Sequence, residues 1–184
     1  NVPTGKDSMS MTQKYKDDVV YAPGTVIVSA VGEVSDLKQV VEPVLQPNFE
    51  STLLYVDMSG DDFKLGGSSF AQIVGKIGTS APTIKSASRF AATFDYVQQL
   101  IKEGKVLAGH DVSAGGLITA LLEMTFSQVD LGISADLKTI KGADDISVFF
   151  SEKPALVLQI ANEHLAEVVG NLSALGTINY ELGA

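Results

Sequence analysis

No cysteine occurs among the 184 residues of this chain, and only two histidines, His110 and His164, are present. The lack of cysteine excludes disulfides, thiolate metal sites and a cysteine nucleophile within these residues. Two histidines are too few for a zinc site built on several imidazoles. A protein without disulfides fits a reducing compartment, so we expect a cytoplasmic location.

Long apolar runs are also missing. No run approaches the roughly 20 residues that a membrane-spanning helix needs. Residues 1–6 (NVPTGK) lack both an initiating Met and the apolar segment of a secretory signal. We therefore expect a piece of a longer protein, without a membrane partner.

Positive charge is scarce as well. Thirteen Lys and Arg residues against 22 Asp and Glu residues give a net charge of −9. This balance argues against a nucleic-acid backbone or an anionic membrane as the main partner. With 45% hydrophobic and 19% charged residues, the chain suits a globular domain with a substantial core.

Strand and helix patterns are both present, without a strict alternation of the two. Apolar runs predict strands at residues 53–56, 106–108 and 155–160, and alternation predicts one at 131–137. Helical spacing and capping residues predict helices that begin near residues 68, 86, 115 and 162. The mixture predicts an α+β fold with helices packed on a mixed sheet. We assign residues 1–20 to the tail of a preceding unit and residues 21–184 to one domain.

The stretch GHDVSAGGL, residues 109–117, is the most informative motif. An apolar strand runs into Asp111 and Ser113, and Gly115 and Gly116 then open an apolar helix. The start of a helix can offer free backbone N–H groups to an anion. A carboxylate and a hydroxyl suit Mg²⁺ that bridges to phosphate. The motif predicts a nucleotide–Mg²⁺ contact, with the alternative that Ser or Asp before a helix is only a cap.

A second helix start, at Gly66, Gly67 and Ser68, resembles the first. It predicts a further anion contact, and the apolar spacing after it predicts a helix that extends through Ile77. The alternative is that these glycines allow close packing against a strand. Two such starts in one small domain suggest that both serve the same ligand.

Other catalytic arrangements have little support. Adjacent residues of a strand point to opposite faces, so His110 and Asp111 are poorly placed as the base and orienter of a hydrolase. Residues 5–8 (GKDS) lack the spacing of a phosphate-binding loop. The pairs Asp17-Asp18, Asp61-Asp62 and Asp144-Asp145 are interpreted as solvated loop charges.

In three motifs, the chain resembles the phosphoribosylformylglycinamidine synthase family of the large, single-chain type. The motifs are residues 3–11 (PTGKDSMSM), 65–72 (LGGSSFAQ) and 110–117 (HDVSAGGL), the last followed by Glu123-Met124. A fourth, weaker match is residues 150–154 (FSEKP). Their order and spacing extend the resemblance over essentially the whole chain.

The resemblance implies the second C-terminal half of that enzyme's synthetase region, an AIR-synthase-related C-terminal domain. The family reaction converts formylglycinamide ribonucleotide, ATP and glutamine to formylglycinamidine ribonucleotide, ADP, phosphate and glutamate. The resemblance implies that Asp111 binds Mg²⁺ and that Ser113 contacts bound ATP or ADP, in a unit whose nucleotide is thought to be structural. Many relatives have Asp where this chain has Ala114, so no role of that second carboxylate is carried over.

The same resemblance sets the expected partners. These are the remaining synthetase and glutaminase domains of a longer chain. Without them, we expect this piece to be inactive. We also expect it to self-associate, because apolar faces that would pack on the missing domains are exposed. One alternative is a purely architectural module that binds nothing. Another is a C-terminal half from the same superfamily, such as selenophosphate synthetase, thiamine-monophosphate kinase or a hydrogenase-maturation protein.

Overall fold

The computed structural model describes residues 4–7, 12–21, 26–34, 36–128 and 130–183. Its contacts divide the chain into two units, Asn1–Leu37 and Lys38–Ala184. The predicted boundary after residue 20 stays a prediction. In the first unit, the described strands form two antiparallel pairs: β1 (Thr4–Asp7) with β4 (Val26–Ser29), and β2 (Thr12–Lys14) with β3 (Val19–Tyr21).

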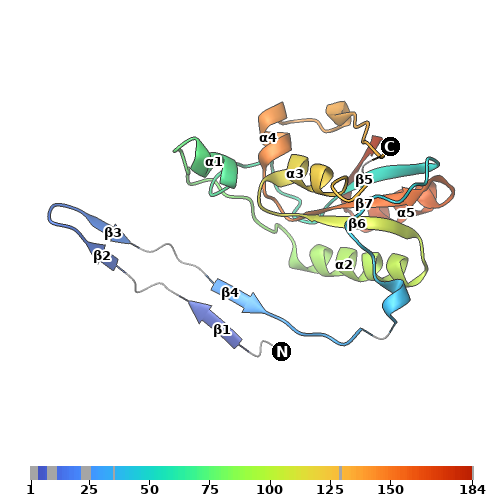
Figure 1. The fold of residues 1–184 in the computed structure, drawn as a ribbon, viewed down its shortest axis with the longest axis horizontal. Coiled ribbons are helices and arrows are strands. Elements are labelled where there is room, and N and C mark those ends of the chain that lie inside the picture. Colours follow the sequence, from blue (N-terminus) through green and yellow to red (C-terminus); the bar gives the residue numbers. More distant parts are fainter. Residues whose placement is uncertain (1–3, 8–11, 22–25, 35, 129, 184) are drawn as a thin grey trace. The chain divides into compact units, whose positions relative to one another are not determined.

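The second unit is built on a four-stranded sheet with the order β6-β7-β5-β8 (Figure 1). Its strands are β5 (Ser51–Asp57), β6 (Val106–Val112), β7 (Ala155–Ala161) and β8 (Ile178–Gly183). Every neighbouring pair in this sheet is antiparallel. The α+β class is confirmed, whereas the expected mixed pairing is wrong. Strands β5 and β6 have β7 inserted between them, as in a split β-α-β unit, so their helical connection does not produce parallel neighbours.

Two long helices cover one face of this sheet and shorter helices cover the other (Figure 1). The long ones are α2 (Ala87–Lys102) and α5 (Asn162–Ala174), and the shorter ones are α3 (Gly116–Glu123) and α4 (Asp145–Phe150). Helix α2 begins where expected because the Ser86 hydroxyl oxygen accepts the Arg89 N–H at 3.2 Å. It ends before Gly104, whose φ is +69°. None of the helices in the described part of the chain combines the length and apolar character that crossing a bilayer requires.

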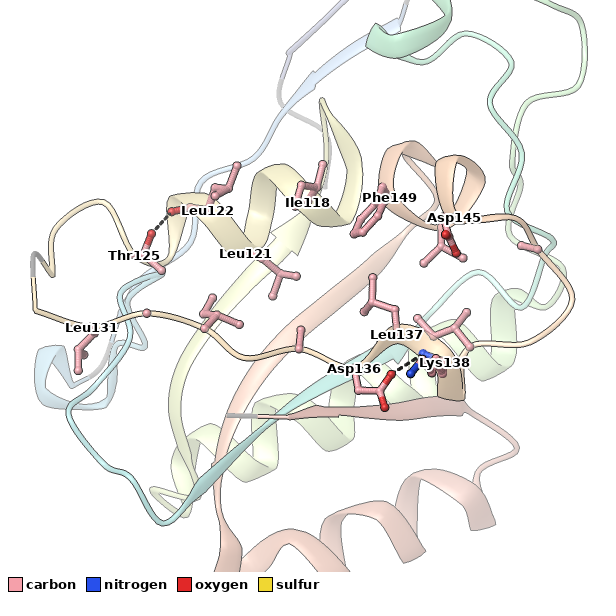
Figure 2. A pocket seen from close by; sticks show the side chains of 16 residues that line it. Ile118, Leu121, Leu122, Thr125, Leu131, Asp136, Leu137, Lys138, Asp145 and Phe149 are labelled. Atoms are coloured by element: carbon pink, nitrogen blue, oxygen red, sulfur yellow. Dashed lines mark hydrogen bonds between the residues drawn. The ribbon is translucent and has the colours of Figure 1, made fainter.

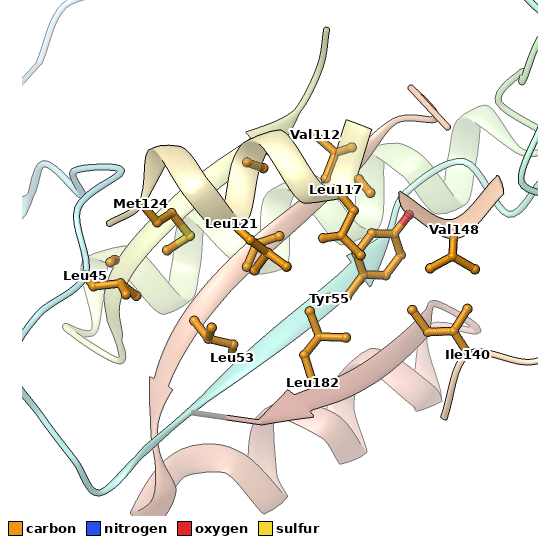
Figure 3. Packing of buried hydrophobic residues seen from close by; sticks show 14 residues of the cluster. Leu45, Leu53, Tyr55, Val112, Leu117, Leu121, Met124, Ile140, Val148 and Leu182 are labelled. Atoms are coloured by element: carbon orange, nitrogen blue, oxygen red, sulfur yellow. The ribbon is translucent and has the colours of Figure 1, made fainter. Parts of the chain in front are cut away.

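Strand β5 supplies side chains to a hydrophobic core on each face of the sheet. Leu53 and Tyr55 pack with Leu117 and Leu121 of α3, as Figure 3 shows. The alternate residues Leu54 and Val56 belong to a second core, which also contains these buried residues of α2 and α5: Val97, Leu100, Val168 and Leu172. Because successive side chains of β5 point to opposite faces of the sheet, this strand contributes buried residues to both cores.

Two predicted elements differ from the structure. Helix α1 covers only Ser69–Ile73, and Ile73 is 85% exposed, so the apolar spacing that continues to Ile77 does not mark a buried face. The chain leaves the helix at Gly75, where φ is +67°. Residues 131–137 form no strand; a single bridge joins Ala135 to Gly183, and a 3₁₀ turn, η2 (Leu137–Thr139), follows. The alternating residues Leu131 and Ile133 instead pack against the core from a loop.

Candidate functional site

Asp111 lies within strand β6, which extends to Val112 and so beyond the predicted strand of residues 106–108. It is paired across the ladder with Leu156 of β7, so the two side chains share a face of the sheet. That face borders a groove of about 510 Å³ whose lining includes Asp111, Phe90, Phe94, Leu156 and Leu158. The Asp111 side chain is 72% exposed. An accessible carboxylate therefore stands at the rim of an apolar groove.

His110 has a different environment from its neighbour. Its Nε2 lies 3.1 Å from Oε2 of Glu123 in α3, and its side chain is 14% exposed. Its Nδ1 lies 2.7 Å from the carbonyl oxygen of Asp111, whereas the Asp111 carboxylate is 3.7 Å from that nitrogen. His110 thus packs toward α3 and does not form a close base–carboxylate pair with Asp111.

A metal ion at this site would receive one carboxylate from the chain. Among the described residues, no group of three or more His, Asp and Glu side chains is arranged to hold a metal. Ser113, the predicted nucleotide contact, is exposed in the turn after β6, and Ala114 beside it is also exposed. Mg²⁺ favours one or two carboxylates combined with water and phosphate oxygens, so the donor set fits a metal that arrives with a nucleotide.

Two backbone N–H groups of the turn at residues 113–116 donate to protein oxygens. The Gly116 N–H donates to the Ser113 carbonyl at 3.0 Å, and the Gly115 N–H donates to Oε1 of Glu152 at 2.8 Å. Both glycines have positive φ, +88° at Gly115 and +75° at Gly116. A β-carbon at Gly116 would lie 2.5 Å from the Phe149 carbonyl oxygen. Close packing therefore requires glycine here, whatever else binds.

The N–H groups of the second glycine turn also donate to protein oxygens. Three N–H groups donate to carbonyl oxygens: Gly66 to Ser80 at 3.0 Å, Gly67 to Ile77 at 2.9 Å and Ser68 to Leu65 at 3.1 Å. The Ser68 hydroxyl oxygen caps α1 by accepting the Ala71 N–H at 3.2 Å. The next N–H, that of Ser69, donates to Oε1 of Glu152 at 2.7 Å. The N–H groups expected to receive an anion thus already donate to protein acceptors.

Glu152 brings the two turns together. One of its carboxylate oxygens, Oε1, accepts the N–H of Ser69 and that of Gly115. Partial burial raises the pKa of this carboxyl group, but the hydrogen bonds from Gly115 and Ser69 outweigh burial and hold the pKa below its ordinary value. The two glycine motifs meet at a carboxylate of the chain itself, and a ligand common to both stays a prediction. Sequence reasoning missed Glu152, whose only signal was the weak FSEKP match.

Lys153, the residue after Glu152, belongs to a network of buried charges. Lys153 Nζ is 2.7 Å from Oδ2 of Asp57, and the two side chains are 1% and 2% exposed. Asp61 is also buried, and its carboxylate is 2.7 Å from Lys64 Nζ and 3.2 Å from Lys85 Nζ. The hydrogen bond from Lys64 is the largest cause that holds the pKa of Asp61 well below its ordinary value. The interpretation of Asp61 as a solvated charge is therefore wrong.

A larger pocket lies elsewhere, between α3, α4 and the loop of residues 131–140. It has a volume of about 680 Å³, and Figure 2 shows Leu121, Leu137 and Phe149 among its lining residues. The seven predicted site residues, all within the described part of the chain, are absent from its lining. The predicted site residues and this larger pocket thus occupy different places.

Known proteins are similar to this chain in sequence. The family model for AIR synthase related protein, C-terminal domain, matches residues 58–183. Phosphoribosylformylglycinamidine synthase of Homo sapiens is 36% identical over 183 residues, which cover 99% of this chain and 14% of that protein. The probable chloroplastic/mitochondrial phosphoribosylformylglycinamidine synthase of Arabidopsis thaliana is 39% identical over 171 residues, which cover 92% of this chain and 12% of that protein. The chain thus spans a small part of the length of these relatives.

Solved structures share the fold at low sequence identity. PurL of Thermotoga maritima complexed with ATP matches with a TM-score of 0.59 at 11% identity, over 86% of this chain and 24% of that one. The same protein complexed with FGAR also has a TM-score of 0.59, at 12% identity, over 86% of this chain and 26% of that one. At these identities, the likeness concerns the fold alone.

Proposed function

The chain belongs to the family of AIR synthase related proteins as a C-terminal domain, and we propose that it is one such domain of a phosphoribosylformylglycinamidine synthase. The identity of 36% over 99% of the chain supports this assignment. The whole enzyme would convert formylglycinamide ribonucleotide, ATP and glutamine to formylglycinamidine ribonucleotide, ADP, phosphate and glutamate. It would thus act as an ATP-dependent carbon–nitrogen ligase with glutamine as the amide donor.

Within that enzyme, this domain would contribute a contact to a nucleotide and its Mg²⁺. Asp111 would bind the metal and Ser113 would donate its hydroxyl to a phosphate oxygen. The observation that carries this proposal is the exposed carboxylate of Asp111 at the rim of the groove beside α2. A carboxylate at the rim of the groove would repel a free nucleotide anion. Mg²⁺ would offset this repulsion.

The glycine turns would have a supporting role in this site. The N–H groups of Gly66, Gly67, Gly115 and Gly116 donate to protein oxygens, which favours shaping of the turns over direct contact with phosphate. The same observation favours the alternative of a purely architectural module. Binding of ADP in the presence of Mg²⁺, compared between the chain and its Asp111→Asn variant, separates the two functions. An architectural module would bind no ADP.

The remaining synthetase and glutaminase domains of the longer enzyme are the proposed partners. Several apolar side chains on the second unit are exposed and are available to such contacts, among them Ile73 (85%), Ile77 (60%) and Phe126 (72%). We expect the chain alone to self-associate, which sedimentation velocity would detect as species heavier than the monomer of 19.4 kDa. We also expect it to form no product from ATP and ammonia.

A cytoplasmic location belongs to the same proposal. It rests on the absence of cysteine, which fits a reducing compartment. The name of the Arabidopsis relative places that protein in chloroplasts or mitochondria. Fractionation of cells that express the tagged protein would test the location of this one.

A further inference from the structure

The carboxylate of Glu152 is shared between two helix starts that are far apart in sequence. Its Oε1 accepts the N–H of Ser69, the first residue of α1, at 2.7 Å, and the N–H of Gly115, the N-cap of α3, at 2.8 Å. Gly115 has no side chain with which to cap its own helix. One charged oxygen therefore serves as the acceptor for both turns, and hydrogen bonds to a charged acceptor are stronger than neutral ones.

The segment that carries Glu152 has little freedom to move. On one side, the Ser151 hydroxyl donates to the Lys64 carbonyl at 2.8 Å. On the other, Lys153 is buried against Asp57, with 2.7 Å between Nζ and Oδ2. Two residues before Glu152, Phe150 stacks on Phe70 of α1 with 4.7 Å between ring centroids. Residues 150–153 thus form a fixed strap, which we call the FSEK strap.

The FSEK strap also lies directly against α3. A β-carbon added at Gly116 would approach the Phe149 carbonyl oxygen to 2.5 Å and the Phe150 backbone to 2.8 Å. A displacement at the start of α3 would therefore press on the strap as well as on the hydrogen bond to Glu152. Because interiors are close-packed, such a displacement is transmitted and not absorbed.

From this geometry, we infer that Glu152 is a positioning residue that couples the turn at Ser113–Gly116 to the turn at Gly66–Ser69. A ligand held beside Ser113 then also orders the start of α1, which it does not touch. Glu152 makes no contact with the reacting groups in this role. The effect of a ligand rests on the proposed function, whereas the coupling between the two turns does not.

Amide hydrogen exchange of the chain, resolved by NMR at Ser69 and Gly115, tests the coupling. In Glu152→Ala, both amides lose their acceptor, and we expect their exchange to accelerate about ten- to hundredfold together. Glu152→Gln keeps one acceptor oxygen without the charge, so it should restore part of the protection at both amides. Glu50→Ala, which removes an exposed carboxylate, is the matched control and should change neither. Acceleration at only one amide in the variants of Glu152 would overturn the inference.

Two further measurements are needed. The first separates a positioning role of Glu152 from a general loss of structure, and the second separates the coupling of the two turns from the proposed function. Amides in the centre of β7 should keep their protection in Glu152→Gln; a loss there equal to that at Ser69 would contradict a positioning role. In the unmodified chain, ADP with Mg²⁺ should shift the signals of both Ser69 and Gly115, and Glu152→Ala should abolish the shift at Ser69. If ADP with Mg²⁺ shifts neither signal in the unmodified chain, the proposed function fails, while the paired exchange at the two amides still decides the coupling.

Discussion

Lys153 and Asp57 form an ion pair inside the protein, with 2.7 Å between Nζ and Oδ2 and at most 2% of either side chain exposed. The other carboxylate oxygen of Asp57 accepts the hydroxyl of Ser59 at 2.8 Å and the N–H groups of Ser59 and Gly60, each at 2.9 Å. The Lys153 ammonium also donates to the carbonyl of Asp61 and lies 4.1 Å from the centroid of the Phe63 ring. Both charges are thus surrounded by partners, and they fix the strap that carries Glu152.

Removal of this lysine should destabilise the protein strongly. In Lys153→Met, the Asp57 carboxylate stays buried without its counter-charge, and we expect the free energy of unfolding to fall by about 3 kcal/mol or more. Urea denaturation followed by circular dichroism measures the change. Lys105→Met is the matched control, because Lys105 pairs with Glu103 and Glu167 at the surface, and it should lower the free energy of unfolding far less. Equal losses in the two variants would contradict the structural role of Lys153.

Glycine at position 116 should be required for stability. Its φ is +75°, and a β-carbon would lie 2.5 Å from the Phe149 carbonyl oxygen. Gly116→Ala should therefore lower the free energy of unfolding by about 1–3 kcal/mol. Gly170, inside α5, has open space at the same position, and Gly170→Ala should raise the free energy of unfolding by about 0.5–1 kcal/mol. Thermal unfolding compares the two, and an unchanged Gly116→Ala would show that the start of α3 tolerates a side chain.

Asp61 should make the protein sensitive to acid. Its pKa in the folded state lies below the ordinary 3.8, chiefly because of the hydrogen bond from Lys64. A lowered pKa stabilises the folded state fully above the unfolded value, and this stabilisation is lost as the pH falls toward the folded value. Asp61→Asn should therefore make the free energy of unfolding less dependent on pH below about 4. Urea denaturation at several pH values in that range measures this pH dependence, and Lys64→Met should reduce it as well. An unchanged pH dependence in both variants would show that Asp61 is not the source of the acid sensitivity.

Local signals were enough to predict much of the fold. The apolar runs at 53–56 and 155–160 lie within β5 and β7, and Ser86 caps α2 as its position suggested. The apolar spacing through Ile77 predicted a longer helix than α1, because periodicity does not show whether an apolar helix face will pack against another element. The loop of residues 131–137 alternates for another reason: its apolar side chains pack on the core without a neighbouring strand.

The candidate site was predicted only in part, for a physical reason. Asp111 and Ser113 are recognisable because they lie together in sequence beside two glycines. The contacts of Glu152 join residues separated by 83 and 37 positions, which no local pattern reports. The burial of Asp61 likewise depends on Lys64 and Lys85, which the fold brings to it.

The most direct test of the proposed function is a calorimetric titration of the chain with ADP in the presence of Mg²⁺. We expect saturable binding that disappears when EDTA removes the metal and weakens at least about tenfold in Asp111→Asn. Asp95→Asn, which neutralises an exposed carboxylate of α2, should bind as the unmodified chain does. Equal affinity in Asp111→Asn and the unmodified chain, or no binding by either, would contradict a nucleotide–Mg²⁺ contact at Asp111.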